Sequence, residues 1–150
     1  MSASKPVDVS STSAGDAAAA GLLHGLAAGL AMAAFLAAAG LLRGQGPVET
    51  LAAFTLSGQP AASSALTGLL GHLAVAAVYG LIWGLAWRVL GGRTAIPAWL
   101  GGLVYGLLLW GGAQLLVRSF GSGLAQLAPW ALLAGHLVYG LTVGWLSRNG

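Results

Sequence analysis

Four long apolar stretches with almost no charge constrain this chain more than any other feature. They cover residues 17–42, 65–87, 96–117 and 127–146. A helix needs about 20 apolar residues to cross the hydrocarbon core of a bilayer. Only 6% of the 150 residues are charged, whereas a soluble domain carries about 25%. We therefore predict an all-α, polytopic membrane protein with four transmembrane helices.

Short connections indicate how these helices are arranged. Glycine-containing turns join the second stretch to the third and the third to the fourth. Short connections favour antiparallel neighbours, so the predicted architecture is an antiparallel four-helix bundle. Residues 1–16 are small and polar, and we expect them to form a flexible tail before a single domain at 17–150. A signal peptide is not expected, because its apolar region is only about 7–15 residues long.

The first connection, residues 43–64, is longer and of mixed polarity. Pro47 suits the first turn of a helix, and Glu49 would interact favourably with the positive end of the helix dipole. We predict a short interfacial helix here, with Leu51, Phe54 and Leu56 against the membrane or the end of the bundle. The alternative is an ordinary surface loop.

Basic residues near the ends of the stretches predict the orientation. The side that holds the N-terminus carries four of them: Lys5, Arg88, Arg93 and Arg148. The opposite side carries Arg43 and Arg118. The excess of positive charge predicts that both termini are cytoplasmic. We also expect the protein to be integral to the cytoplasmic (inner) membrane. Tryptophans near the predicted interfaces fit an aromatic belt: Trp87, Trp99, Trp130 and Trp145.

Glycines four residues apart recur in every stretch, and each tyrosine precedes one of them in a VYGL sequence. Residues four apart share a helix face, and a face of small residues lets two helices pack closely in lipid. We predict helix packing through nine glycines: Gly21, Gly25, Gly29, Gly80, Gly84, Gly102, Gly106, Gly140 and Gly144. So many smooth faces also suggest packing against other membrane subunits or self-association.

Ionisable and hydroxyl side chains inside the stretches are candidates for a polar pocket or a ligand site. They are His24, His72, Tyr79, Tyr105, His136 and Tyr139. Such groups at membrane depth usually face the bundle interior and often mark function. Two interpretations remain: each group bonds a carbonyl of a neighbouring helix, or the groups share a pocket.

The depths of the histidines bear on cofactor binding. At 1.5 Å per residue, His72 lies about 8 Å outward and His24 about 10 Å inward of His136. This stagger disfavours a haem held by two histidines, and no cofactor is expected. A haem or chlorophyll on a single axial histidine, His72 or His136, stays open. A proton relay is disfavoured because no Asp or Glu lies in any stretch.

Several classes of chemistry are disfavoured by composition. The absence of cysteine removes thiolate nucleophiles and thiolate metal sites. The stretches hold no carboxylate and no nucleophile–His–acid pattern, so we predict a protein that is not an enzyme and has no metal site. Six basic residues are too few for a nucleic-acid surface.

Three segments together resemble an uncharacterised bacterial family of small four-span inner-membrane proteins. They are GLLHGLAAGLAMAAF, LLGHLAVAAVYGLIWG and GHLVYGLTVGW, within residues 20–147. The resemblance implies a four-helix membrane fold and no particular activity.

The residues leave three functions open. The first is a non-enzymatic membrane protein that serves as an accessory or structural subunit of a larger complex. The second is a small transporter or channel lined by the histidines and tyrosines. The third is a haem- or chlorophyll-type pigment binder. The expected partners are membrane lipid and other membrane subunits or copies of the chain, and nucleic acid is not among them.

Overall fold

The computed structural model describes residues 13–55, 61–120 and 127–149, and all its regular structure over these ranges is helical. Five α-helices follow one another: α1 (Ala14–Leu41), α2 (Pro47–Ala52), α3 (Ala61–Leu90), α4 (Ala98–Phe120) and α5 (Pro129–Leu146). Two short 3-10 turns, η1 (Gly91–Arg93) and η3 (Ser147–Asn149), follow α3 and α5. The prediction of an all-α chain is confirmed.

Three described helices are long and apolar enough to cross a membrane: α1 over its full length, α3 from Ser64 to Leu90, and α4 from Ala98 to Val117. They match the first three predicted stretches and indicate a membrane protein. The fourth stretch forms α5, which has 18 residues and is therefore about 27 Å long. It is not among the three helices, so the fourth crossing stays a prediction.

Helix α1 begins three residues before the predicted stretch because its N-terminus is capped. The amide of Asp16 donates to Ser13 Oγ at 3.1 Å, and the amide of Ser13 donates to Asp16 Oδ2 at 3.3 Å. This reciprocal capping box satisfies amides that the first turn leaves without helical partners. Residues 14–16, expected in the tail, are thus helical, and residues 1–12 lie outside the described part.

The predicted short helix in the first connection is confirmed as α2. Pro47 occupies its first turn, and the amide of Gly46 donates to Glu49 Oε2 at 2.7 Å. Thr50 faces inward and is buried, with its Oγ1 against Gly40 of α1. Leu51 and Phe54 contact Gly68 of α3. Helix α2 therefore packs on both α1 and α3, while Val48 on its other side is exposed. Leu56 lies outside the described residues.

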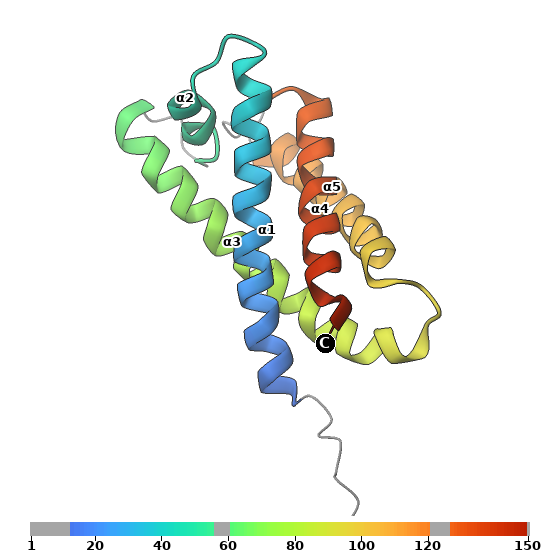
Figure 1. Cartoon of the computed structure of the whole chain (residues 1–150). Helices are drawn as coiled ribbons and strands as arrows, with labels where there is room; N and C mark the ends of the chain where they lie inside the picture. The colour runs from blue at the N-terminus through green and yellow to red at the C-terminus, as the bar shows by residue number, and fades with distance from the viewer. Residues whose placement is uncertain (1–12, 56–60, 121–126, 150) are drawn as a thin grey trace, which may run out of the picture.

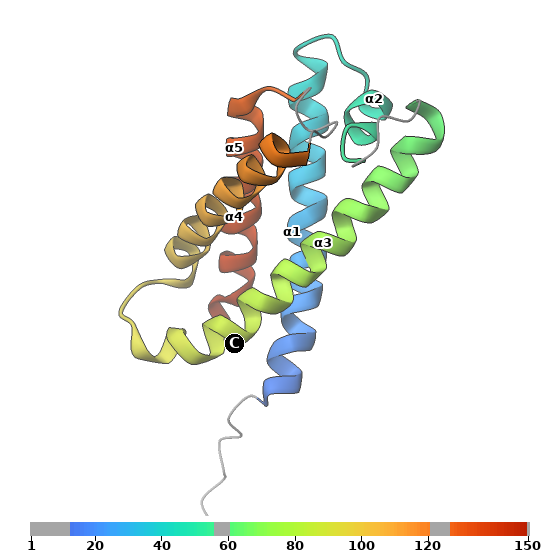
Figure 2. The same ribbon diagram turned by 180° about the vertical axis from the view of Figure 1, so that it is seen from behind.

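The chain reverses direction at each connection (Figure 1). Helices α1 and α4 run one way, and α3 and α5 run the other way, so the start of α1, the η1 turn and the end of α5 share one end of the molecule. The most extensive contacts join α1 to α3, α4 to α5, and α1 to α5. Helices α3 and α4 meet at η1 and then diverge, with little backbone contact (Figure 2).

A central core lies where α1, α3 and α5 meet. Leu36 and Val143 are fully buried, and Met32, Trp83 and Tyr139 pack with them. A smaller cluster near α2 contains Ala53, Leu127 and Leu132, with Trp110 of α4 against it. Helices α1, α3 and α5 therefore supply the buried residues of the central core, while α4 lies at its edge.

Candidate functional site

Glycines bring α1 and α3 into backbone contact. A Cβ on Gly25 would meet the carbonyl oxygen of Ala76, and a Cβ on Gly21 would meet that of Gly80. Gly84 lies in the same way against the carbonyl oxygen of Ala17. No side chain larger than hydrogen fits these positions at this separation, so the glycines set how closely the two helices pack.

A second set of glycines joins α4 to α5. Gly102 lies against the carbonyl oxygen of Gly140, and Gly106 lies against that of His136. Gly144 faces the carbonyl oxygen of Ala98. The remaining predicted glycine, Gly29 of α1, lies against the Ala76 methyl group and beside His72.

All nine glycines predicted for helix packing therefore face helices of the same chain. Their smooth faces are used inside the protein and do not by themselves imply a partner. Three other helical glycines, Gly71, Gly111 and Gly112, have no neighbouring atom within 4 Å of an added Cβ. At these positions on α3 and α4, no other part of the chain packs against the glycine.

Two of the three VYGL tyrosines bond to carbonyls of α3. Tyr139 is 2% exposed, and its hydroxyl donates to the Ala76 carbonyl at 2.7 Å. The hydroxyl of Tyr105 donates to the Tyr79 carbonyl at 2.9 Å. A hydroxyl at membrane depth needs such a partner, and a helical carbonyl has a second lone pair to offer. These bonds tie α5 and α4 to α3.

The third tyrosine, Tyr79, differs from the other two. Its hydroxyl has no hydrogen-bond partner among the described residues, and its ring lines a shallow, open, apolar depression with Ala74, Val75 and Val78. The three tyrosines thus share a sequence frame but differ in the contacts of their hydroxyls.

Aromatic rings fill the space between α3 and α4. Trp83 stacks on Trp87 with ring centroids 4.9 Å apart, and Tyr105 of α4 lies 5.4 Å from Trp83. Gly101 of α4 makes room for the Trp87 ring. Trp87, expected in an interfacial belt, is half-buried in this layer, whereas Trp99, Trp130 and Trp145 are exposed.

His72 links three elements. Its Nε2 lies 3.1 Å from the carbonyl oxygen of Gly29 on α1, and its ring stacks on Phe54, just after α2, at 4.7 Å. Because a carbonyl can only accept, Nε2 carries the proton and donates. His72 therefore holds α3 to α1 where α2 covers them.

His136 bonds within its own helix. Its Nδ1 lies 2.8 Å from the carbonyl oxygen of Leu132, so Nδ1 is the donor by the same reasoning. The Nε2 of a neutral His136 is then left as an acceptor. This is the nitrogen with which the ring would bind an axially held pigment.

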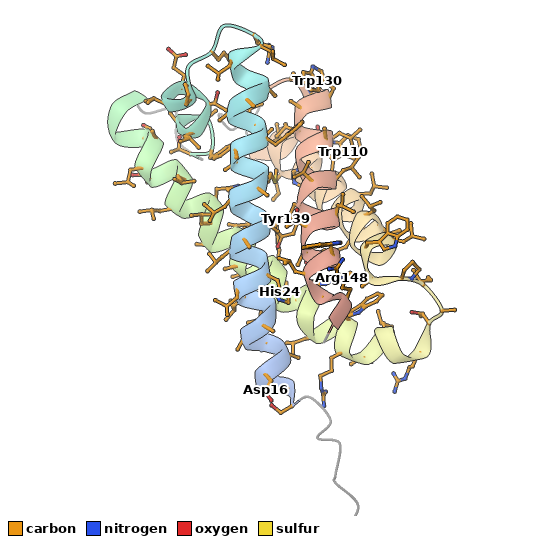
Figure 3. All side chains as sticks on the ribbon, viewed as in Figure 1. Asp16, His24, Trp110, Trp130, Tyr139 and Arg148 are labelled. Carbon is orange, nitrogen blue, oxygen red and sulfur yellow. The ribbon has the colours of Figure 1, made fainter. Side chains whose placement is uncertain are left out.

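His24 joins α1 to the end of α5, in the half of the molecule that also holds Arg148 (Figure 3). Its Nδ1 lies 3.3 Å from Ser147 Oγ. That hydroxyl donates to the Val143 carbonyl at 2.8 Å and accepts from Trp83 Nε1 at 3.1 Å. Its proton is already used, so Ser147 accepts from His24 as well.

Sequence reasoning missed Ser147 and Trp83 as members of this site. The four-residue spacing from Val143 to Ser147 signals a serine that bonds back to its own helix. Nothing in the spacing signals partners on α1 and α3, since these lie 123 and 64 residues away along the chain.

Four of the six predicted site residues thus bond between helices: His24, His72, Tyr105 and Tyr139. Within the described ranges, no three His, Asp or Glu side chains are grouped so as to hold a metal ion. Each of the three histidines bonds through one ring nitrogen, and Tyr105 and Tyr139 bond through their hydroxyls; the acceptor is a backbone carbonyl or Ser147 in every case. This arrangement fastens helices together.

Comparisons with known protein families, with curated proteins and with solved structures find no match.

Proposed function

We propose that the protein is a non-enzymatic integral protein of the cytoplasmic membrane that acts as an accessory or structural subunit of a larger membrane assembly. The observation that carries this proposal is the exposed face of α4. Only 11% of the most apolar stretch of α4 is buried, against 39% for α1. Helix α4 contributes little to the core of its own chain, so most of its surface is available to something else.

The shape of that face supports contact with another helix. Gly111 and Gly112 lie on it with open space above them. Leu108 and Leu115, each 68% exposed, lie on either side of the pair along the helix. A glycine notch between large side chains admits a neighbouring helix closely, and such packing gains contacts that mobile lipid tails do not match.

We further propose that α5 completes a four-span bundle with both termini in the cytoplasm. Helix α5 lies along α1 and α4, so its neighbours shield part of its surface from lipid. Arg88 lies in the last turn of α3, Arg93 ends η1, and Arg148 lies in η3 directly after α5. These elements share the end of the molecule where α1 begins. The positive-inside rule assigns that end to the cytoplasm.

The polar contacts support a structural role in preference to transport or catalysis. Tyr105, Tyr139 and His72 each bond to a carbonyl of another helix. A side chain so engaged would have to break its bond before it could pass a proton or bind a substrate. We therefore expect these residues to maintain the fold of the subunit.

The test is purification of the tagged protein from its native membranes in a mild detergent, with mass spectrometry of what accompanies it. We expect another membrane protein to co-purify in a fixed ratio. We also expect Gly112→Phe to abolish the association, because the new ring would fill the notch, where an added Cβ meets no atom of the chain within 4 Å. Gly71→Phe, an equally open position on α3, is the matched control and should retain the partner. A wild-type protein that purifies only as a lone protomer with lipid would contradict the proposal.

A further inference from the structure

The two closely packed helix pairs make the same contacts at corresponding residues. In the α1–α3 pair, the contacts are Gly21 with Gly80, Gly25 with Ala76, and Gly84 with Ala17. In the α4–α5 pair, they are Gly102 with Gly140, Gly106 with His136, and Gly144 with Ala98. In each contact the glycine faces a backbone carbonyl of the partner helix. The pattern matches α1 to α4 and α3 to α5.

The sequences match in the same register. GLLHGL at 21–26 corresponds to GLVYGL at 102–107, and VYGLIWG at 78–84 corresponds to VYGLTVG at 138–144. Because α1 and α4 run in the same direction, the two pairs are related as parallel repeats about an axis along the helices. The chain is thus built from two versions of one helix pair.

Two equivalent pairs should meet through two equivalent contacts, α1 with α5 and α4 with α3. The α1–α5 side is closed: Met32 and Leu36 pack on Gly135, and His24 contacts Ser147. The α4–α3 side is open along most of its length. Val75, which corresponds to Gly135, is 50% exposed.

Trp87 is a second residue that differs between the two sides. It stands at the position that corresponds to Ser147, where a small hydroxyl lets the helices meet on the closed side. The Trp87 ring stacks on Trp83 and presses against Gly101 of α4. Tyr105, the counterpart of His24, still reaches α3 through the Tyr79 carbonyl. Helices α3 and α4 are therefore in contact at the end near η1 and separated at the other end.

We propose that the α3–α4 side is a hinged gate that closes toward the arrangement of the α1–α5 side, turning at the contact of Trp83, Trp87 and Tyr105. Helix α3 has room for this motion, because a Cβ added to Gly71 would meet no atom within 4 Å at present. On the closed side, the counterpart of Gly71 is Ala131, which is buried. Closure would cover Val75 and the depression beside Tyr79.

The experiment uses the absence of cysteine in the chain. Spin labels on Val75→Cys and Ala113→Cys, the counterparts of Gly135 and Met32, would report the α3–α4 separation in lipid nanodiscs by pulsed electron resonance. Ala27→Cys with Leu141→Cys, on exposed faces of α1 and α5, is the control pair. We expect one narrow distance for the control and two populations for the gate pair, with the shorter one enriched by Trp87→Ser.

A more conservative substitution of Trp87 provides a second test. Trp87→Phe keeps an aromatic ring and should shift the populations less than Trp87→Ser, which gives a graded response even where the serine variant folds poorly. A gate pair with a single long distance, unchanged in Trp87→Phe and in a folded Trp87→Ser protein, would overturn the proposal.

Discussion

At the scale of single residues, the absence of a Cβ at a few glycines sets the distance between helices. Gly25 and Gly140 allow backbone contact that alanine would prevent, because a Cβ there would collide with a carbonyl oxygen of the facing helix. Backbone atoms cannot rotate away as a side chain can. The helices themselves would have to separate, with loss of packing along their length.

This reasoning predicts that Gly25→Ala destabilises the protein by about 1–3 kcal/mol, the usual cost of forcing a methyl group into a packed site. The free energy of unfolding in mixed detergent micelles measures the effect. Gly111→Ala is the matched control, since nothing lies within 4 Å of its added Cβ, and it should cause no loss. Equal losses in both variants would show that the contact with Ala76 does not matter.

At the scale of elements, hydrogen bonds to the α3 carbonyls attach the other helices to it. Tyr139 bonds from α5 and Tyr105 from α4, although neither helix has extensive backbone contact with α3. His72 adds a bond from α3 to α1. Side-chain hydrogen bonds therefore hold α4 and α5 to α3, and close glycine contacts hold α1 to α3.

We predict that Tyr139→Phe lowers the free energy of unfolding by about 0.6 kcal/mol, the average measured for hydrogen bonds between helices in a membrane, and by no more than about 1.7 kcal/mol, the measured maximum. The loss comes from the missing bond to the Ala76 carbonyl, while the buried ring still fills its space. Tyr79→Phe removes a hydroxyl that has no partner among the described residues, and its stability should match that of the wild type. A Tyr79→Phe loss as large as that of Tyr139→Phe would refute the role assigned to the Ala76 bond.

At the scale of the whole molecule, the two helix pairs join on one side only. The core lies at the α1–α5 side, and the aromatic layer of Trp83, Trp87 and Tyr105 holds α3 and α4 apart near η1. Most large apolar side chains of α4 therefore face outward. A molecule of this shape is suited to lie in lipid and among other helices.

The topology of the whole molecule gives a prediction about α5. Single cysteines at Arg43 and Trp130 should react with a membrane-impermeant maleimide added outside intact cells or spheroplasts. Cysteines at Arg93 and Arg148 should react only after the membrane is opened, because the proposed fourth crossing places them in the cytoplasm. Labelling of positions 130 and 148 from the same side would show that α5 does not cross.

The sequence by itself determined three things: where the long helices lie, that they are apolar enough for a membrane, and which of their faces carry small residues. Apolar length decides how much hydrocarbon a segment can cross, and residues four apart share a face whatever surrounds the helix. Even the short α2 was predictable, because Pro47 and Glu49 act within a single turn. These are properties of neighbouring residues along the chain.

Only the tertiary structure decided which faces meet. It paired the glycines of α1 with α3 and those of α4 with α5, gave His24 its contact with Ser147, and placed Trp87 between α3 and α4. The glycine faces of the four helices look alike in sequence, so their pairing depends on how the whole chain packs. On the α3–α4 side, Trp87 and Val75 stand where the other helix pair has Ser147 and Gly135.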